Sequence, residues 1–309
     1  MAYNPKRCLW FGTEDYMQWF PTPLQGADSS PEAWGVDGTL LNGGGYGLGS
    51  WGSHKTYTYE WPSYSSMEVA QMMKSYADGT YGRGLIYFLD PLTYKYNILP
   101  ARIADPSMAC GDEGGSMVYG ADPEQVSTSG WQQNLLPISA AYYDLGAVPS
   151  GFRGKEEATF IPIPQGYTLL LGAFYETTGS GGIFVSPRLA NGTIGSAVEL
   201  DAKSPSDSEI VDPSLELSGI PGVYLWLGKS SSDAASVTAR ALIGRLVANE
   251  DLSSPAKMAQ VTAGPWIGGM GHSGCRFSGK PTFSSISPLD GGRAEFAASF
   301  REVGSWAFG

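Results

Sequence analysis

The fold is decided by Tyr167-Thr168-Leu169-Leu170-Leu171-Gly172-Ala173-Phe174-Tyr175, the longest strongly apolar run in the chain, which is typical of a buried β-strand. Other short runs rich in apolar and β-branched residues lie around it, separated by turn residues. Their spacing predicts a β-sandwich or jelly roll between residues 113 and 255. These runs are 158–163, 182–185, 197–200, 214–217, 223–227 and 236–247.

Two details of this middle stretch concern local structure. Asn191-Gly192 is the strongest hairpin signal in the chain, because a tight hairpin turn requires residues that accept positive φ. The run 236–247 is ambiguous, since Val237 and Ile243 fit a two-residue alternation while Leu242 and Leu246 fit a helical face. We favour a strand there.

The composition supports the same fold class. The 309 residues include 42 Gly and 21 Pro and only 16% charged residues, so few helices are expected. The hydrophobic content of 42%, with 12% aromatic residues, is sufficient for a buried core. The length suits two domains, and the sequence predicts a mainly β protein.

Charge and hydropathy exclude several classes of partner. The net charge of −11, without a cluster of Lys and Arg, repels phosphate backbones and predicts no nucleic-acid partner. The run 167–175 is less than half the roughly 20 residues that a membrane span needs. Residues 1–8 lack the apolar core of a signal peptide, which predicts synthesis without export. Three widely spaced cysteines, Cys8, Cys110 and Cys275, favour reduced thiols over a disulfide framework.

The first hundred residues predict an α+β unit. Residues 43–49 are rich in glycine and suggest a flexible loop, and 54–60 alternate as a strand does. Ser65 and Glu68 form a capping box for a helix that ends near Gly79. Residues 84–89 and 94–98 then suggest a buried strand and its return. The buried face of the helix is expected to carry Val69, Met72, Met73 and Tyr76.

Charge and tryptophan content divide the chain into three stretches. Residues 1–112 and 256–309 carry net charges of −4 and +2 and are rich in Trp and Gly, whereas residues 113–255 carry −9. One interpretation joins 1–112 with 256–309 in a single domain into which the acidic domain 113–255 is inserted. The alternative is three consecutive units.

A search for catalytic, cofactor and metal motifs finds none. The histidines, His54 and His272, have no partner recognisable from spacing. The run 271–275 resembles a nucleophile elbow, but Cys275 stands where that motif needs glycine. Residues 47–52 spell G-x-G-x-x-G, yet the expected strand follows this motif instead of preceding it. We therefore expect no enzymatic activity and no cofactor.

Aromatic residues are the remaining candidates for binding. Tyr224 and Trp226 lie on one face of a predicted strand, where they either stack on a glycan or fill the sandwich core. The tryptophans of the low-charge ends either contact neighbouring subunits or belong to an ordinary aromatic core. The candidates for a subunit interface are Trp10, Trp34, Trp51 and Trp306.

Several stretches together resemble the minor tail proteins of long-tailed phages that infect actinobacteria. They cover about half of the chain and carry no motif with a chemical mechanism. The stretches are 7–12, 57–76, 85–91, 97–100, 269–274 and 301–306.

The resemblance implies a distal-tail role. The first domain would have a tail-tube-like β-fold with one flanking helix and would assemble in a ring at the tail tip. The domain 113–255 would resemble the peripheral galectin-like or carbohydrate-binding domains of such rings, although it shows no sugar-binding signature. The implied partners are copies of the protein itself, the tail tube, the tape measure and other minor tail proteins, and a host glycan. The implied location is the virion, and the alternative function is a stand-alone carbohydrate-binding adhesin module.

Overall fold

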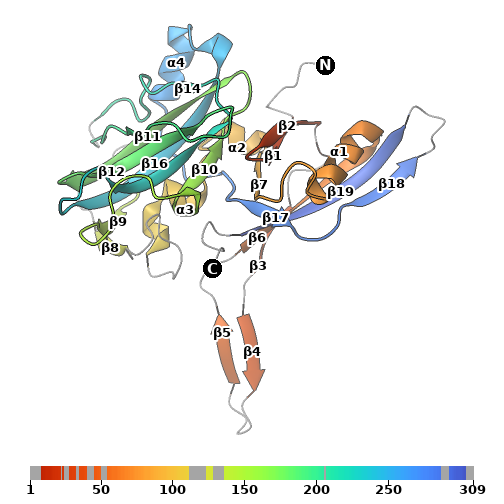
Figure 1. Ribbon diagram of the computed structural model, residues 1–309, viewed down its shortest axis with the longest axis horizontal. Helices are drawn as coiled ribbons and strands as arrows, with labels where there is room; N and C mark the ends of the chain where they lie inside the picture. The colour runs from red at the N-terminus through yellow and green to blue at the C-terminus, as the bar shows by residue number, and fades with distance from the viewer. Residues whose placement is uncertain are drawn as a thin grey trace.

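The computed structural model describes residues 8–21, 23, 28–32, 35–39, 45–49, 54–110, 123–127, 136–204, 207–286 and 292–303. Within them the protein consists mostly of antiparallel strands, so the prediction of a mainly β fold is confirmed. Figure 1 shows one large sheet beside a pair of packed sheets, with a separate two-stranded hairpin.

The first sheet combines strands from both ends of the chain. Its order is β2-β1-β7-β17-β19-β6-β3, and β18 also pairs with β19. Strand β19 runs along β6, and β17 pairs with both β19 and β7. The strands are β1 (Leu9–Thr13), β2 (Tyr16–Phe20), β3 (Asp28–Glu32), β6 (His54–Ser66), β7 (Ile86–Leu89), β17 (Cys275–Phe277), β18 (Thr282–Ile286) and β19 (Arg293–Glu302).

Helix α1 (Met67–Ala77) packs on this sheet close to where the sequence predicts a helix. Its N-cap is Ser66 rather than Ser65, because β6 continues to Ser66 in register with Arg293. Met73 and Tyr76 are buried as expected, whereas Val69 and Met72 are half-buried at the edge of the same core. The chain leaves the helix at Gly79, whose φ of +77° suits glycine.

The expected return strand 94–98 is wrong. Residues Pro91–Lys95 form the short helix α2 instead, because the Asp90 carboxylate accepts a 2.6 Å hydrogen bond from the Thr93 amide. Pro91 occupies the first turn, where its missing N–H costs nothing. The short helices α3 (Ala101–Ala104) and η1 (Pro106–Ala109) follow.

Two antiparallel sheets made from the middle of the chain pack face to face. Leu169 and Leu171 point into their shared core, opposite Leu225 of the other sheet. The region 236–247 is a strand, as favoured. One sheet has the order β10-β15-β12-β13 and the other β14-β11-β16-β9-β8. The strands are β8 (Glu124–Ser127), β9 (Ser139–Asp144), β10 (Thr159–Pro162), β11 (Tyr167–Thr178), β12 (Gly181–Arg188), β13 (Val198–Glu199), β14 (Leu217–Ser218), β15 (Gly222–Lys229) and β16 (Ser236–Ala248).

The outer faces of this sheet pair are covered as well. The five-stranded sheet packs under α4 (Pro255–Thr262) and Trp266, after the turn η4 (Asn249–Asp251). The four-stranded sheet lies against Tyr87 of the first sheet and against the segment leading to η3 (Lys155–Glu157). Ile98 and Ile103 belong to the core of the sheet pair. Residues 98–104 and 255–266 therefore pack on the middle sheets, although the expected division places them with the chain ends.

Strands β4 (Gly35–Thr39) and β5 (Gly45–Gly49) form a hairpin that pairs with no other described strand. Figure 1 shows it extending below the rest of the chain. Residues 45–49 are thus a strand and not the flexible loop expected from their glycines, because backbone pairing requires no side chain.

Two further expectations concern cysteines and membranes. Cys275 is buried in the core as a free thiol, whereas the free thiols of Cys8 and Cys110 are half-buried. No helix among the described residues has the length and apolarity to cross a membrane.

Candidate functional site

His272 has a carboxylate partner that spacing did not reveal. Its Nε2 lies 3.0 Å from Oδ2 of Asp90, and both side chains are largely buried. The rings of Tyr57 and Phe88 cover the imidazole, with centroids 4.4 and 4.3 Å away. Asp90 is placed by the end of β7, and His272 by the segment that leads into β17.

The geometry of this pair is not that of a catalytic triad. A triad needs the carboxylate on one imidazole nitrogen and the nucleophile on the other. Here the Thr93 hydroxyl lies 3.3 Å from the same Nε2 that faces Asp90, and it donates to the carbonyl of Met270. Among the described residues, the buried Nδ1 of His272 has no hydrogen-bond partner. No nucleophilic side chain in the described ranges is hydrogen-bonded to the Nδ1 side of the ring.

Two ionisable side chains near His272, those of Cys275 and Tyr57, are shifted towards their neutral, protonated forms. Burial raises the pKa of the Cys275 thiol well above its ordinary value, and Glu302 adds to this, so the thiol stays protonated. The Tyr57 hydroxyl donates to Oε1 of Glu302 at 2.9 Å. Burial and this carboxylate raise the pKa of Tyr57. Within the described part of the chain, no group of three His, Cys, Asp or Glu side chains is arranged to hold a metal ion.

Tyr224 and Trp226 are brought together, but inside the protein. Their exposed fractions are 0% and 5%. Trp226 stacks on Phe184 with centroids 4.5 Å apart and donates its indole N–H to Ser186. The pair therefore presents no open ring face on which a glycan could stack, because the first sheet and the segment before η3 cover this side of β15.

The turn between β1 and β2 reaches this aromatic face with two carboxylates. Oε2 of Glu14 accepts from the Tyr224 hydroxyl at 2.7 Å and from Lys155 Nζ at 2.6 Å. Burial and Glu14, against the lowering effect of Lys155, raise the pKa of Tyr224 to about 12. The next residue, Asp15, accepts from the buried guanidinium of Arg188. These contacts fix the first sheet against the middle sheets.

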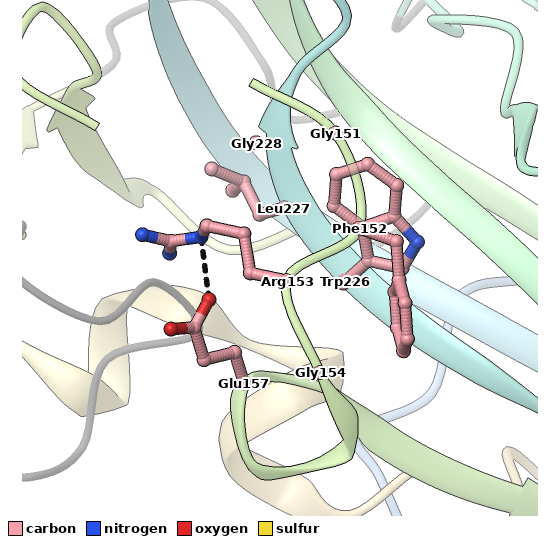
Figure 2. Close-up of a pocket in the computed structure, with 8 residues that line it drawn as sticks. All are labelled: Gly151, Phe152, Arg153, Gly154, Glu157, Trp226, Leu227 and Gly228. Carbon is pink, nitrogen blue, oxygen red and sulfur yellow. Dashed lines mark ion pairs between the residues drawn. The ribbon is translucent and has the colours of Figure 1, made fainter. Parts of the chain in front are cut away.

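A small hollow lies beside Trp226. Figure 2 shows the rings of Trp226 and Phe152 on one side of the segment 151–154, with Arg153 and Glu157 on the other. Arg153 Nε and Glu157 Oε2 are 2.5 Å apart, so the two charges compensate each other. Burial, opposed by Arg153, raises the pKa of Glu157. The room inside the hollow is about that of a single water molecule, which is far too little for a ligand.

The tryptophans expected at a subunit interface have different outcomes. Trp10 is buried and packs edge-on against Trp19, with centroids 5.0 Å apart. It offers little surface to a neighbour. Trp34, Trp51 and Trp306 lie outside the described residues.

The sequence did not reveal the roles of Asp90, Glu14 and Asp15. Asp90 before Pro91 is a helix-start signal that could have been recognised. Glu14 and Asp15 stand at a turn between two apolar strands, where acidic residues ordinarily face solvent, and no local pattern indicates their distant partners.

Comparison of the chain with models of protein families, with curated proteins and with solved structures found no match.

Proposed function

We propose that this protein is a structural subunit of the tail tip of a long-tailed phage, where it binds copies of itself and neighbouring tail proteins. The proposal that it is a tail protein rests on the resemblance of six stretches to minor tail proteins of actinobacterial phages. Two of these stretches lie side by side: Met270 donates its amide to the Asn97 carbonyl at 2.9 Å, and Gly271 donates to the Leu99 carbonyl at 2.9 Å. Two of the stretches that carry the resemblance, 97–100 and 269–274, are therefore hydrogen-bonded to each other in the fold.

The observation that carries an assembly role is the β4–β5 hairpin. In the described chain its strands pair only with each other, and Figure 1 shows it standing apart from the sheets. A lone two-stranded hairpin is at best marginally stable in water. An arm of this kind gains its stability by packing against a neighbouring molecule.

The charge distribution suggests how the subunits would be oriented. Residues 113–255 carry −9 and residues 256–309 carry +2. Acidic regions of adjacent copies repel one another, so they would project from the particle while the weakly charged ends form the contacts. As a tail subunit, the protein would be made in the host cytoplasm and incorporated into the virion.

The test replaces residues 34–51 with a short Gly-Ser linker and measures mass by sedimentation over a range of concentrations. The intact protein is expected to assemble into closed rings visible by negative-stain microscopy, and the linker variant to stay monomeric with an unchanged midpoint of thermal unfolding. A matched control inserts a Gly-Ser pair after Asn191, in an exposed turn of the middle sheets.

Three results would overturn the proposal. One is an intact protein that stays monomeric at every concentration, and another is a linker variant that assembles normally. The third is hydrolysis of cell-wall polymers that is lost on His272→Ala. A monomer with sugar affinity would instead favour the alternative, a stand-alone carbohydrate-binding module.

A further inference from the structure

Three tyrosines form a column from the core of the first sheet to its surface. Tyr76 of α1 is buried, Tyr81 is half-buried and Tyr16 is 44% exposed. The rings of Tyr16 and Tyr81 stack with centroids 4.5 Å apart and planes at 11°, and Tyr81 lies 4.7 Å from Tyr76. The Tyr16 ring therefore stacks on Tyr81 and is exposed to solvent.

The backbone beneath these rings is fixed. The Tyr76 hydroxyl donates to the carbonyl of Tyr16 at 3.0 Å, and the Thr13 hydroxyl donates to the carbonyl of Tyr81 at 2.7 Å. These bonds join the β1–β2 turn to the segment that follows α1. A platform held in this way loses little conformational entropy when a ligand binds.

A carboxylate is held beside the platform. Asp15 is next to Tyr16 in the chain, and its side chain is 71% exposed although its Oδ1 accepts from Arg188, whose side chain is only 5% exposed. Oδ2 faces Gly82, the residue after Tyr81: a Cβ built on that glycine would lie 3.7 Å from it. No donor among the described residues bonds to Oδ2, so it is open to a hydroxyl group.

We propose that Tyr16, Tyr81 and Asp15 form a binding platform for a neutral carbohydrate. The C–H bonds on one face of a sugar ring carry partial positive charge and rest on the electron-rich face of an aromatic ring. A fixed carboxylate accepts hydrogen bonds from adjacent sugar hydroxyls, and charge-assisted bonds of this type are the strong ones. The exposed carboxylate and the net charge of −11 disfavour anionic sugars.

The surroundings favour a sugar over a protein partner. The exposed residues that flank Tyr76 and Tyr81 in the chain include the polar Asp78, Thr80 and Arg83. Cores of protein–protein interfaces are depleted of charged residues. The platform residues Tyr16 and Asp15 lie at the β1–β2 turn, whose Glu14 reaches the buried Tyr224, but the platform itself is exposed whereas Tyr224 and Trp226 are not. The platform does not depend on ring assembly.

The experiment titrates the full-length protein with neutral oligosaccharides of galactose, glucose, mannose and arabinose, by calorimetry and by saturation-transfer NMR. Tyr16→Ala is expected to weaken binding about tenfold, and Tyr16→Phe to retain most of it because the ring remains. Asp15→Asn is expected to weaken binding while stacking persists. Phe283→Ala, at an aromatic residue of similar exposure elsewhere on the sheet, is the matched control and is expected to bind normally.

Two outcomes would overturn the proposal: no binding of any of these sugars by the intact protein, or binding that Tyr16→Ala leaves unchanged. If Tyr16→Ala does not fold, ring-proton NMR of the intact protein decides, because binding elsewhere would leave the Tyr16 and Tyr81 resonances unshifted. Failure of this test leaves the sedimentation assay for ring assembly unaffected, and a monomeric protein that binds sugar through Tyr16 would refute assembly alone.

Discussion

The side-chain oxygen of Asn97 accepts a hydrogen bond from the amide of Gly244 at 2.9 Å, across 147 positions of the chain. The same oxygen accepts from the Leu99 amide, and the side-chain nitrogen donates to the carbonyls of Leu242 and Ile267 at 3.0 Å. Asn97 is completely buried. One amide group therefore joins the segment after α2, the central strand β16 and the segment leading to β17.

We predict that Asn97→Leu lowers the free energy of unfolding by at least about 3 kcal/mol, because it leaves several buried backbone groups without partners. Chemical denaturation followed by tryptophan fluorescence measures the change. Asn191→Ala, in an exposed turn, is the control and should cost no more than about 1 kcal/mol. Equal costs for the two variants would contradict the role assigned to Asn97.

In helix α1 we predict that Met73→Ala costs about 2–5 kcal/mol, since Met73 is completely enclosed and its removal leaves a cavity. Met72→Ala should cost clearly less, because Met72 lies at the edge of the core. Thermal and urea unfolding of both variants measures the difference, with the exposed Gln71→Ala as the reference. A larger loss at Met72 than at Met73 would show that the helix is rotated from the orientation described.

The Asp90–His272 pair predicts a loss of stability in acid. Burial alone would raise the pKa of Asp90, but the hydrogen bond and charge of His272, together with the Thr93 amide, outweigh it and lower the pKa. A lowered pKa in the folded state contributes stability that is present above the unfolded value of about 3.9 and is lost as the pH falls through the folded value.

Wild-type protein should therefore lose stability below about pH 4 more steeply than Asp90→Asn, which has no carboxylate to protonate there. At neutral pH the same substitution should cost about 1–3 kcal/mol. Urea unfolding between pH 3 and 7 measures both effects, with Asp144→Asn at an exposed position as control. Parallel pH profiles for wild type and Asp90→Asn would refute the coupling.

The contact between Glu14 and Tyr224 predicts energetic coupling between the first sheet and the middle sheets. In a double-mutant cycle, Glu14→Gln and Tyr224→Phe should show a coupling energy of about 0.5–3 kcal/mol, because their side chains share a hydrogen bond. Replacing Tyr224→Phe by Tyr142→Phe, on strand β9 of the other middle sheet, should give additive effects. Additivity in the first cycle would mean that this contact contributes nothing to holding the sheets together.

Local chemistry determined much of the secondary structure. Apolar and β-branched runs such as 167–175 become strands because a pleated, buried backbone accommodates them, and Gly79 ends α1 because the chain there needs positive φ. The sequence also contains the signal for α2, because Asp90-Pro91 is a typical helix start. The mainly β class follows from features of this kind, each confined to a few neighbouring residues.

Only the tertiary structure decided which faces are covered. Tyr224 and Trp226 have the same alternation whether they face solvent or another sheet, and they are buried because Tyr87 of the first sheet and Phe152 pack on them. Two side-chain pairs also join segments that are distant in the chain: Asp90 with His272, and Asp15 with Arg188. The spacing of apolar residues within one segment predicts whether it forms a helix or a strand. Which other segment it packs against depends on the packing of the whole chain, and local spacing does not determine that.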